Sequence, residues 1–125
     1  MTAKRVLSVG QCGLDHGGIA HTFRHAFDAE VTAAATHAQA LELLRKNTFD
    51  LVLVNRVLDA DGDSGVDLIH QIKADEALRA TPVMLVSNYA DAQKEAVAEG
   101  AEPGFGKSSL GRPEMLQGVR PFLGD

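Results

Sequence analysis

Short apolar runs, separated by stretches with helical spacing, set the hydrophobic pattern of this chain. The runs are Val6–Val9, Val31–Ala35, Leu51–Val54 and Val83–Val86, with Gly104–Phe105 as a shorter fifth candidate. Continuous runs of about four to six β-branched and leucine residues are typical of strands that are buried on both faces, as in a parallel sheet. The pattern therefore predicts a set of buried parallel strands, of which the second is the least apolar.

The stretches between these runs carry helical patterns and helix-start signals. Within Ile19–Phe27, apolar residues recur at every fourth position and share one helix face. Thr36 with Gln39, and Ser64 with Asp67, have the spacing of a capping box, in which side chains satisfy the free N–H groups of a first helical turn. We therefore predict helices that begin after Thr36 and after Ser64.

Two more helices are predicted in the last third of the chain. Asp91 is expected to cap a helix that continues through Glu99 and ends at Gly100. Pro113 suits the first turn of a last helix. The apolar residues of that helix are Leu116, Val119 and Leu123.

Strands and helices therefore alternate along the chain, which predicts a parallel sheet with right-handed crossovers and helices on both faces. The 125 residues contain no internal repeat or linker and suit one domain. Ligands of such sheets bind beyond the carboxyl ends of the strands. Functional residues are therefore expected after Val9, Val54, Val86 and Phe105.

Composition narrows the function classes without naming one. The chain has 12 Lys and Arg against 17 Asp and Glu, so its net charge of -5 gives no reason to expect binding to nucleic acid or to an anionic membrane. No apolar stretch reaches the ~18 residues of a membrane helix. A single cysteine, Cys12, excludes an internal disulfide and fits the reducing cytoplasm.

Segments that end at three of the predicted strands carry a resemblance. Phe49–Asn55, Pro82–Ser87 and Gly100–Lys107 resemble the third strand, the fourth strand and the segment before the lysine in receiver domains of two-component response regulators. The resemblance covers about Lys4 to Leu123. It implies a flavodoxin-like (βα)5 three-layer sandwich with a five-stranded parallel sheet, as one receiver-like domain spanning residues 1–125.

The chain departs from that family at the positions that carry its chemistry. The aspartate that accepts a phosphoryl group in the family is Asn55 here, and the acidic pair that holds magnesium is Gly10 and Gln11. An amide is a poor nucleophile, and magnesium prefers anionic oxygens. Ser87 and Lys107 keep the family's hydroxyl and lysine. The resemblance thus implies a degenerate receiver that binds no magnesium and needs no other cofactor.

Other positions bear on partners. The switch aromatic of the family is replaced by Gly104, which lies with Lys94 and the last helix on the face that many receivers use to dimerise. Arg56 and Tyr89 are expected at the pocket rim as contacts for a partner. We therefore expect a stand-alone, non-enzymatic signalling module that acts independently of phosphorylation. Its partner would be a histidine kinase or another regulator in trans, with a homodimer as a further possibility.

Loss of the family's carboxylates leaves Lys107 as the charged group of the pocket, which allows two interpretations. Lys107 and Ser87, with nearby backbone N–H groups, favour a small anion, so a small-anion-sensing binding module is the alternative function. Lys107 can instead pair with an acid from a nearby loop, namely Asp15, Asp59 or Asp61.

The acidic segment after the third predicted strand resembles a calcium loop only in part. Asp59, Asp61 and Asp63 provide the first three acids of such a loop. Its glycine and its bidentate glutamate are replaced by Ser64 and His70. A solvated loop with Asx-type turns is the prediction here, rather than a calcium site.

Potential metal ligands also gather near the start of the chain. Cys12, His16, His21 and His25 lack a partner at a tight motif spacing, so histidines on a helix surface are the expectation. Cys12 lies near a predicted helix start, where a reactive thiol is a further expectation. The glycines between residues 10 and 18 form no phosphate-binding motif and predict a strand-to-helix turn.

Overall fold

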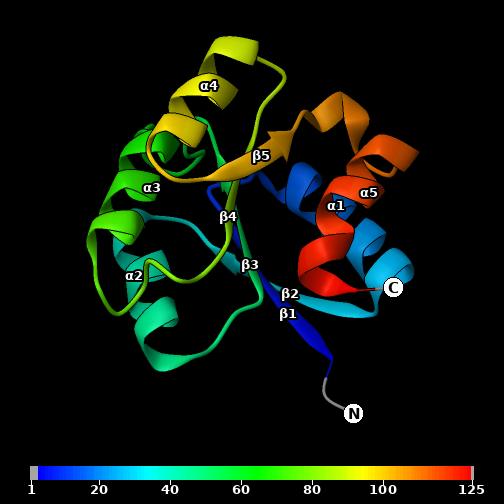
Figure 1. Cartoon of the computed structure of the whole chain (residues 1–125), viewed down its shortest axis with the longest axis horizontal. Coiled ribbons are helices and arrows are strands. Elements are labelled where there is room, and N and C mark those ends of the chain that lie inside the picture. Colours follow the sequence, from blue (N-terminus) through cyan, green and yellow to red (C-terminus); the bar gives the residue numbers. More distant parts are fainter. Residues whose placement is uncertain (1–2, 125) are drawn as a thin grey trace.

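Residues 3–124 are described by a computed structural model, in which five parallel strands form one sheet with helices on both faces (Figure 1). The strands are β1 (Lys4–Val9), β2 (Ala29–Ala34), β3 (Leu51–Asn55), β4 (Val83–Val86) and β5 (Glu102–Phe105). Their order in the sheet is β2-β1-β3-β4-β5, and every neighbouring pair is parallel. The predicted flavodoxin-like fold is confirmed.

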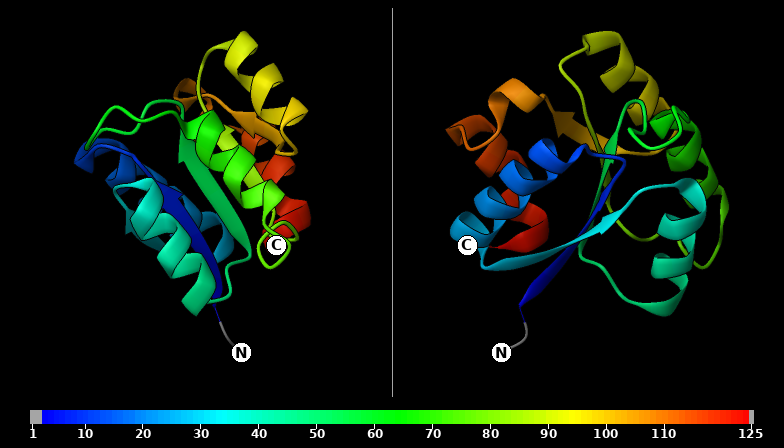
Figure 2. Two further views of the ribbon diagram at one scale, coloured as in Figure 1. Left: turned by 90° about the vertical axis from the view of Figure 1, so that its left-hand side faces the viewer. Right: turned by 180° about the vertical axis from the view of Figure 1, so that it is seen from behind.

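Helices cover the sheet in two groups (Figures 1 and 2). The helices are α1 (Gly13–Phe27), α2 (His37–Lys46), α3 (Gly65–Ala74), α4 (Ala90–Ala98) and α5 (Pro113–Leu123), with a 3₁₀ turn η1 (Lys107–Ser109) before the last. One face of the sheet packs against α1 and α5, and the other packs against α2, α3 and α4. The result is the predicted three-layer arrangement.

The continuous apolar runs are explained by burial on both faces. In β3, Val52 and Val54 join the core beneath α2, α3 and α4, whereas Leu51 and Leu53 join the core beneath α1 and α5. All four side chains are fully buried. Burying a side chain of this size contributes about 1.5–3 kcal/mol, so the strands hold the carboxyl edge of the sheet rigidly.

Two predicted helix caps are confirmed. The Thr36 hydroxyl accepts a hydrogen bond from the Gln39 N–H (3.2 Å), and the Ser64 hydroxyl accepts one from the Asp67 N–H (3.2 Å). Each bond satisfies a donor that a helix start leaves free. Both helices therefore begin where the sequence places them.

The start of α1 was predicted wrongly. The glycines of the segment 13–18 lie inside the helix and do not form a turn, because Cys12 caps it and its Sγ accepts from the Asp15 N–H (3.4 Å). Gly10 alone makes the sharp turn after β1, with a φ of 76° that favours glycine. Burial of the apolar face further along α1 overrides the low helix propensity of these glycines.

The N-cap of α4 lies two residues before the predicted position Asp91. Tyr89 occupies the cap position without a capping bond from its side chain, and Asp91 lies in the first turn, where a carboxylate favours the helix dipole. Gly100 ends the helix as predicted, with a φ of 108°. Across residues 3–124, none of the helices has the length and apolar character that crossing a membrane requires.

Candidate functional site

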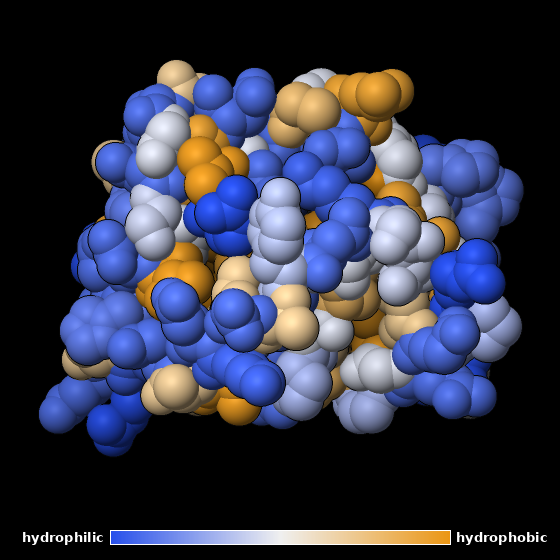
Figure 3. Space-filling view, turned by 90° about the horizontal axis from the view of Figure 1, so that it is seen from above, coloured by the Kyte–Doolittle hydropathy of each residue, from blue (hydrophilic) through white to orange (hydrophobic). Residues whose placement is uncertain are grey.

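A cavity of about 480 Å³ opens at the carboxyl ends of β3, β4 and β5. Its lining includes Asn55, Ser87 and Lys107, with Arg56 and Tyr89 at the side. Figure 3 views this edge of the molecule from above, where hydrophilic side chains predominate between apolar patches. The structure therefore brings together the polar residues that the sequence places at the strand ends.

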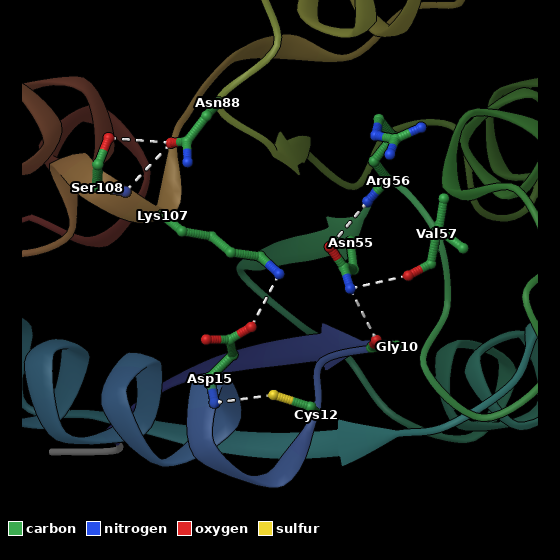
Figure 4. A network of polar contacts seen from close by, with 9 residues as sticks. All are labelled: Gly10, Cys12, Asp15, Asn55, Arg56, Val57, Asn88, Lys107 and Ser108. Carbon is green, nitrogen blue, oxygen red and sulfur yellow. Dashed lines mark hydrogen bonds and ion pairs between the residues drawn. The ribbon is translucent and has the colours of Figure 1, made fainter.

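The side-chain amide of Asn55 forms three hydrogen bonds with backbone groups (Figure 4). Its Nδ2 donates to the carbonyl oxygens of Gly10 (3.0 Å) and Val57 (2.8 Å), and its Oδ1 accepts from the Arg56 N–H (3.0 Å). The side chain is buried at the end of β3. Both amide hydrogens point at carbonyl oxygens, so the amide joins the end of β1 to the loop after β3. A carboxylate cannot donate either of these bonds.

Gly10 leaves no space for a side chain toward the cavity. A Cβ built on Gly10 would lie 2.5 Å from Cγ of Leu58, which is itself buried in the core. The N–H of Gly10 donates to the Ala34 carbonyl (2.8 Å), which fixes the backbone there. Gln11 follows with both amide atoms buried and without a hydrogen-bond partner among residues 3–124, and it does not line the cavity.

Lys107 forms an ion pair across the mouth of the site. Its Nζ lies 2.8 Å from Oδ2 of Asp15, in the first turn of α1 (Figure 4). Of the three acids that the sequence offered, Asp15 is the partner. The hydrogen bond from Lys107 is the main cause that lowers the pKa of Asp15, partial burial opposes it, and a hydrogen bond with Cys12 adds to the lowering.

Removing the lysine should raise the pKa of Asp15. In Lys107→Met we expect this carboxyl to titrate closer to its ordinary value of 3.8. Because the folded pKa lies below the unfolded value, the pair stabilises the fold above that value, and this contribution is lost as the pH falls through the folded pKa. A pH titration of the carboxyl by NMR measures the shift, with Lys94→Met on α4 as a matched control. Identical titration of Asp15 in wild type and Lys107→Met would contradict the pairing.

Ser87 and Asn88 connect the end of β4 to the segments beside it. Ser87 is buried, and its Oγ accepts from the Tyr89 N–H (3.1 Å). Oδ1 of Asn88 accepts from both the N–H (3.2 Å) and the hydroxyl (3.0 Å) of Ser108. Asn88 thus uses only its oxygen here, in contrast to Asn55.

Arg56 and Tyr89 lie against each other at the rim. The guanidinium carbon of Arg56 is 4.8 Å from the centre of the Tyr89 ring, which is the distance of a cation–π contact. Tyr89 is 61% exposed. The pair therefore offers a flat, preorganised surface beside the cavity.

Gln93 is a site residue that sequence reasoning missed. From α4, its Nε2 donates to the carbonyls of Leu85 (2.9 Å), Ser87 (3.1 Å) and Phe105 (3.4 Å). Its Oε1 accepts from the Gly104 N–H (3.2 Å). These bonds span the place where the pairing of β4 with β5 is irregular. A polar residue on a helix has no sequence signal that distinguishes this role from surface exposure.

The remaining candidate ligands lie apart. In the exposed acidic loop, Oδ1 of Asp61 accepts from the Asp63 N–H (3.0 Å), which is an Asx turn. His21 and His25 face each other on α1, with ring centres 4.3 Å apart, away from the capping Cys12. Among residues 3–124, no group of three or more His, Cys, Asp or Glu side chains is arranged to hold a metal ion.

The chain is similar in sequence and in structure to known response regulators. The family model of the response regulator receiver domain matches residues 15–117. Chemotaxis protein CheY-3 of Vibrio cholerae is 37% identical over 65 residues, which cover 52% of this chain and 47% of that protein. The polar-differentiation response regulator DivK of Brucella ovis is 27% identical over 88 residues, or 70% of each chain. The chain thus spans about half the length of the first relative.

A solved structure extends the likeness over the whole chain. A protein described as a response regulator from Chloroflexus aurantiacus superposes with a TM-score of 0.86, covering 99% of this chain and 100% of that one. Its sequence identity is 20%. At that identity the superposition shows the common fold.

Proposed function

Because the chain belongs to the family of response regulator receiver domains, we propose that it is a pseudo-receiver, a signalling module that acts through protein contacts without phosphorylation. Receiver domains are modules of two-component signalling, which sets the class of function. The proposal adds that this module carries no phosphotransfer chemistry of its own. The observation that carries it is the hydrogen bonding of Asn55.

Asn55 stands where the resemblance places the phosphoacceptor. Its amide carries no charge and is a poor nucleophile. Both of its hydrogens are bound to the carbonyls of Gly10 and Val57, so the side chain serves as a structural link in this position. This use of the amide supports a site in which bonding within the fold has replaced covalent chemistry.

The residues at this edge do not fit magnesium. Magnesium binds carboxylate oxygens in a near-octahedral arrangement. Gly10 has no side chain, and Leu58 fills the space where one would project. Asn55 turns N–H groups rather than an anion toward the end of β1. No step of the proposed function therefore depends on a metal ion.

The small-anion sensor at Lys107 and Ser87 is the alternative function. The ion pair between Lys107 and Asp15 weighs against it, because an acid already offsets the charge that would attract an anion. Protein contact is therefore the function that the geometry supports better.

Phosphodonor chemistry tests the proposal directly. After incubation with acetyl phosphate and magnesium, we expect no gain of a phosphoryl group by mass spectrometry. With beryllofluoride and magnesium, we expect the amide NMR signals of Asn55, Ser87 and Lys107 to stay in place. A receiver with an intact phosphoacceptor, treated in parallel, controls for the reagents. A phosphoryl adduct on a neighbouring acid such as Asp59 would refute phosphorylation independence.

The proposed partner is a signalling protein supplied in trans, either a histidine kinase or another regulator. A second copy that docks through α4 and α5 is the alternative partner. Sedimentation velocity over a range of concentrations separates the two, because only self-association makes the sedimentation coefficient rise with concentration.

A further inference from the structure

A second groove adjoins the cavity described above. It lies between the loop after β3 and the helix α4, and its volume is about 480 Å³. We call it the α3–α4 groove and define it by the lining residues Arg56, Val57, Val66, Tyr89, Asp91 and Glu95. It shares Arg56, Val57 and Tyr89 with the cavity at the strand ends.

One wall of the α3–α4 groove exposes apolar surface. Val57 is 41% exposed and Tyr89 is 61% exposed, and they are two of the large exposed apolar side chains in residues 3–124. Val66 lies partly buried in the same groove. Aromatic side chains in such a position bring a large contact area at a low entropic cost, which is why they are common at the centre of interfaces.

The other side of the groove is acidic. Asp91 and Glu95 are exposed on α4, and neither is paired with a cation within residues 3–124. Across the groove, Asp61 and Asp63 are exposed in the loop and flank the lining residue Gly62. Unpaired charges of one sign around an apolar surface select a partner of the opposite sign.

Arg56 is the cation of this lining, and the two acids Asp91 and Glu95 outnumber it. Its guanidinium carbon lies 4.8 Å from the centre of the Tyr89 ring. This contact holds the ring in place and leaves the carboxylates of Asp91 and Glu95 facing solvent. The groove therefore presents an aromatic surface beside a lining in which negative charge exceeds positive charge.

We propose that the α3–α4 groove binds a cationic segment of a partner protein, one that places lysine or arginine against the acids and an apolar anchor against Tyr89. This inference rests on the proposed function and names the chemistry of the partner. A second copy of the chain fits less well, because 17 acidic residues against 12 basic ones make the approach of two copies repulsive.

Tyrosine fluorescence reports on the surroundings of Tyr89 alone, because Tyr89 is the only tyrosine and the chain has no tryptophan. The probe is a short synthetic peptide of lysines interrupted by leucines, without aromatic residues. We expect saturable quenching or enhancement of the Tyr89 signal with this peptide. A peptide with glutamate in place of lysine should give none, and added salt should weaken binding because it screens exposed charges.

Matched charge variants locate the binding surface. In the double variant Asp91→Asn with Glu95→Gln, we expect an affinity loss of about 3- to 30-fold at low salt, from two exposed charge pairs. The control is Glu76→Gln with Glu114→Gln, which removes the same charge from exposed sites outside the groove. Equal losses in the two double variants would overturn the groove and show an effect of net charge only.

The titration is run with and without beryllofluoride and magnesium, so that the two proposals fail separately. Equal binding in both conditions supports the groove and the phosphorylation-independent function. Binding only with beryllofluoride supports the groove and overturns phosphorylation independence. Absence of a Tyr89 response to the lysine peptide in both conditions overturns the groove and leaves the proposed function standing.

Discussion

Asn55→Asp should lower the free energy of unfolding by about 3 kcal/mol, since a buried carboxylate that faces carbonyl oxygens without a hydrogen to donate costs this much or more. The new carboxylate would face the carbonyl oxygens of Gly10 and Val57, to which the wild-type amide donates. Urea unfolding at neutral pH measures the change. The link between the end of β1 and the loop after β3 would be the first part to loosen.

The pH dependence of the stability of Asn55→Asp, and the control variant Asn88→Asp, test the cause of this loss. Facing carbonyl oxygens raises the pKa of the introduced carboxyl, so the deficit should be full at neutral pH and shrink as the pH falls below that raised value. Asn88→Asp is the control, because Asn88 uses only its oxygen, toward Ser108, and a carboxylate keeps both bonds. Equal stability of wild type and Asn55→Asp at neutral pH would show that the Asn55 amide is no link.

Gly104→Ala should lower the free energy of unfolding by about 3 kcal/mol, at the upper end of what overpacking costs. A Cβ at Gly104 would collide with the carbonyl oxygen of Leu85 and approach Oε1 of Gln93 within 2.9 Å. The backbone of β5 must then move away from β4, and the hydrogen bonds between Gln93 and both strands are weakened. Urea unfolding again provides the measurement.

Gly118→Ala is the matched control for this substitution. Gly118 lies on the exposed side of α5, with no atom within 4 Å of an added Cβ. Alanine in a helix interior is more stable than glycine by about 0.5–1 kcal/mol. The same chemical change should therefore stabilise the protein at Gly118 and destabilise it at Gly104. If Gly104→Ala unfolded at the urea concentration of the wild type, the proposed collision between the strands would be wrong.

The central strands β3 and β4 could be predicted from the sequence because they are buried on both faces. β4 matches the run Val83–Val86 at both ends, and the predicted strand Leu51–Val54 gains only Asn55. Strand β2 was the weakest prediction, and it begins and ends earlier than Val31–Ala35. It is an edge strand, as β5 is, and less burial at an edge leaves a weaker apolar signal.

The partners of individual side chains were harder to predict than the strands. The sequence offered three acids for Lys107, and only the position of α1 in space selects Asp15. The sequence alone predicts Gln93 to be a surface residue of its helix. Its hydrogen-bond acceptors belong to two strands, which contact the helix only in the folded protein. The collision of a side chain at residue 10 with Leu58 is likewise a contact between residues 48 positions apart in the chain. Local sequence patterns do not encode contacts at such a separation.

The side chain of Leu58 also restricts the order in which substitutions can accumulate at this edge. A carboxylate introduced at Gly10 alone meets Leu58 and must adopt a φ of 76°. A small residue introduced at Leu58 alone leaves a cavity that costs about 2–5 kcal/mol. Either single step lowers stability, and the pair of changes relieves the contact with the Leu58 side chain but not the positive φ at residue 10. Mutational paths from this chain to an acidic, metal-binding edge therefore pass through a less stable intermediate.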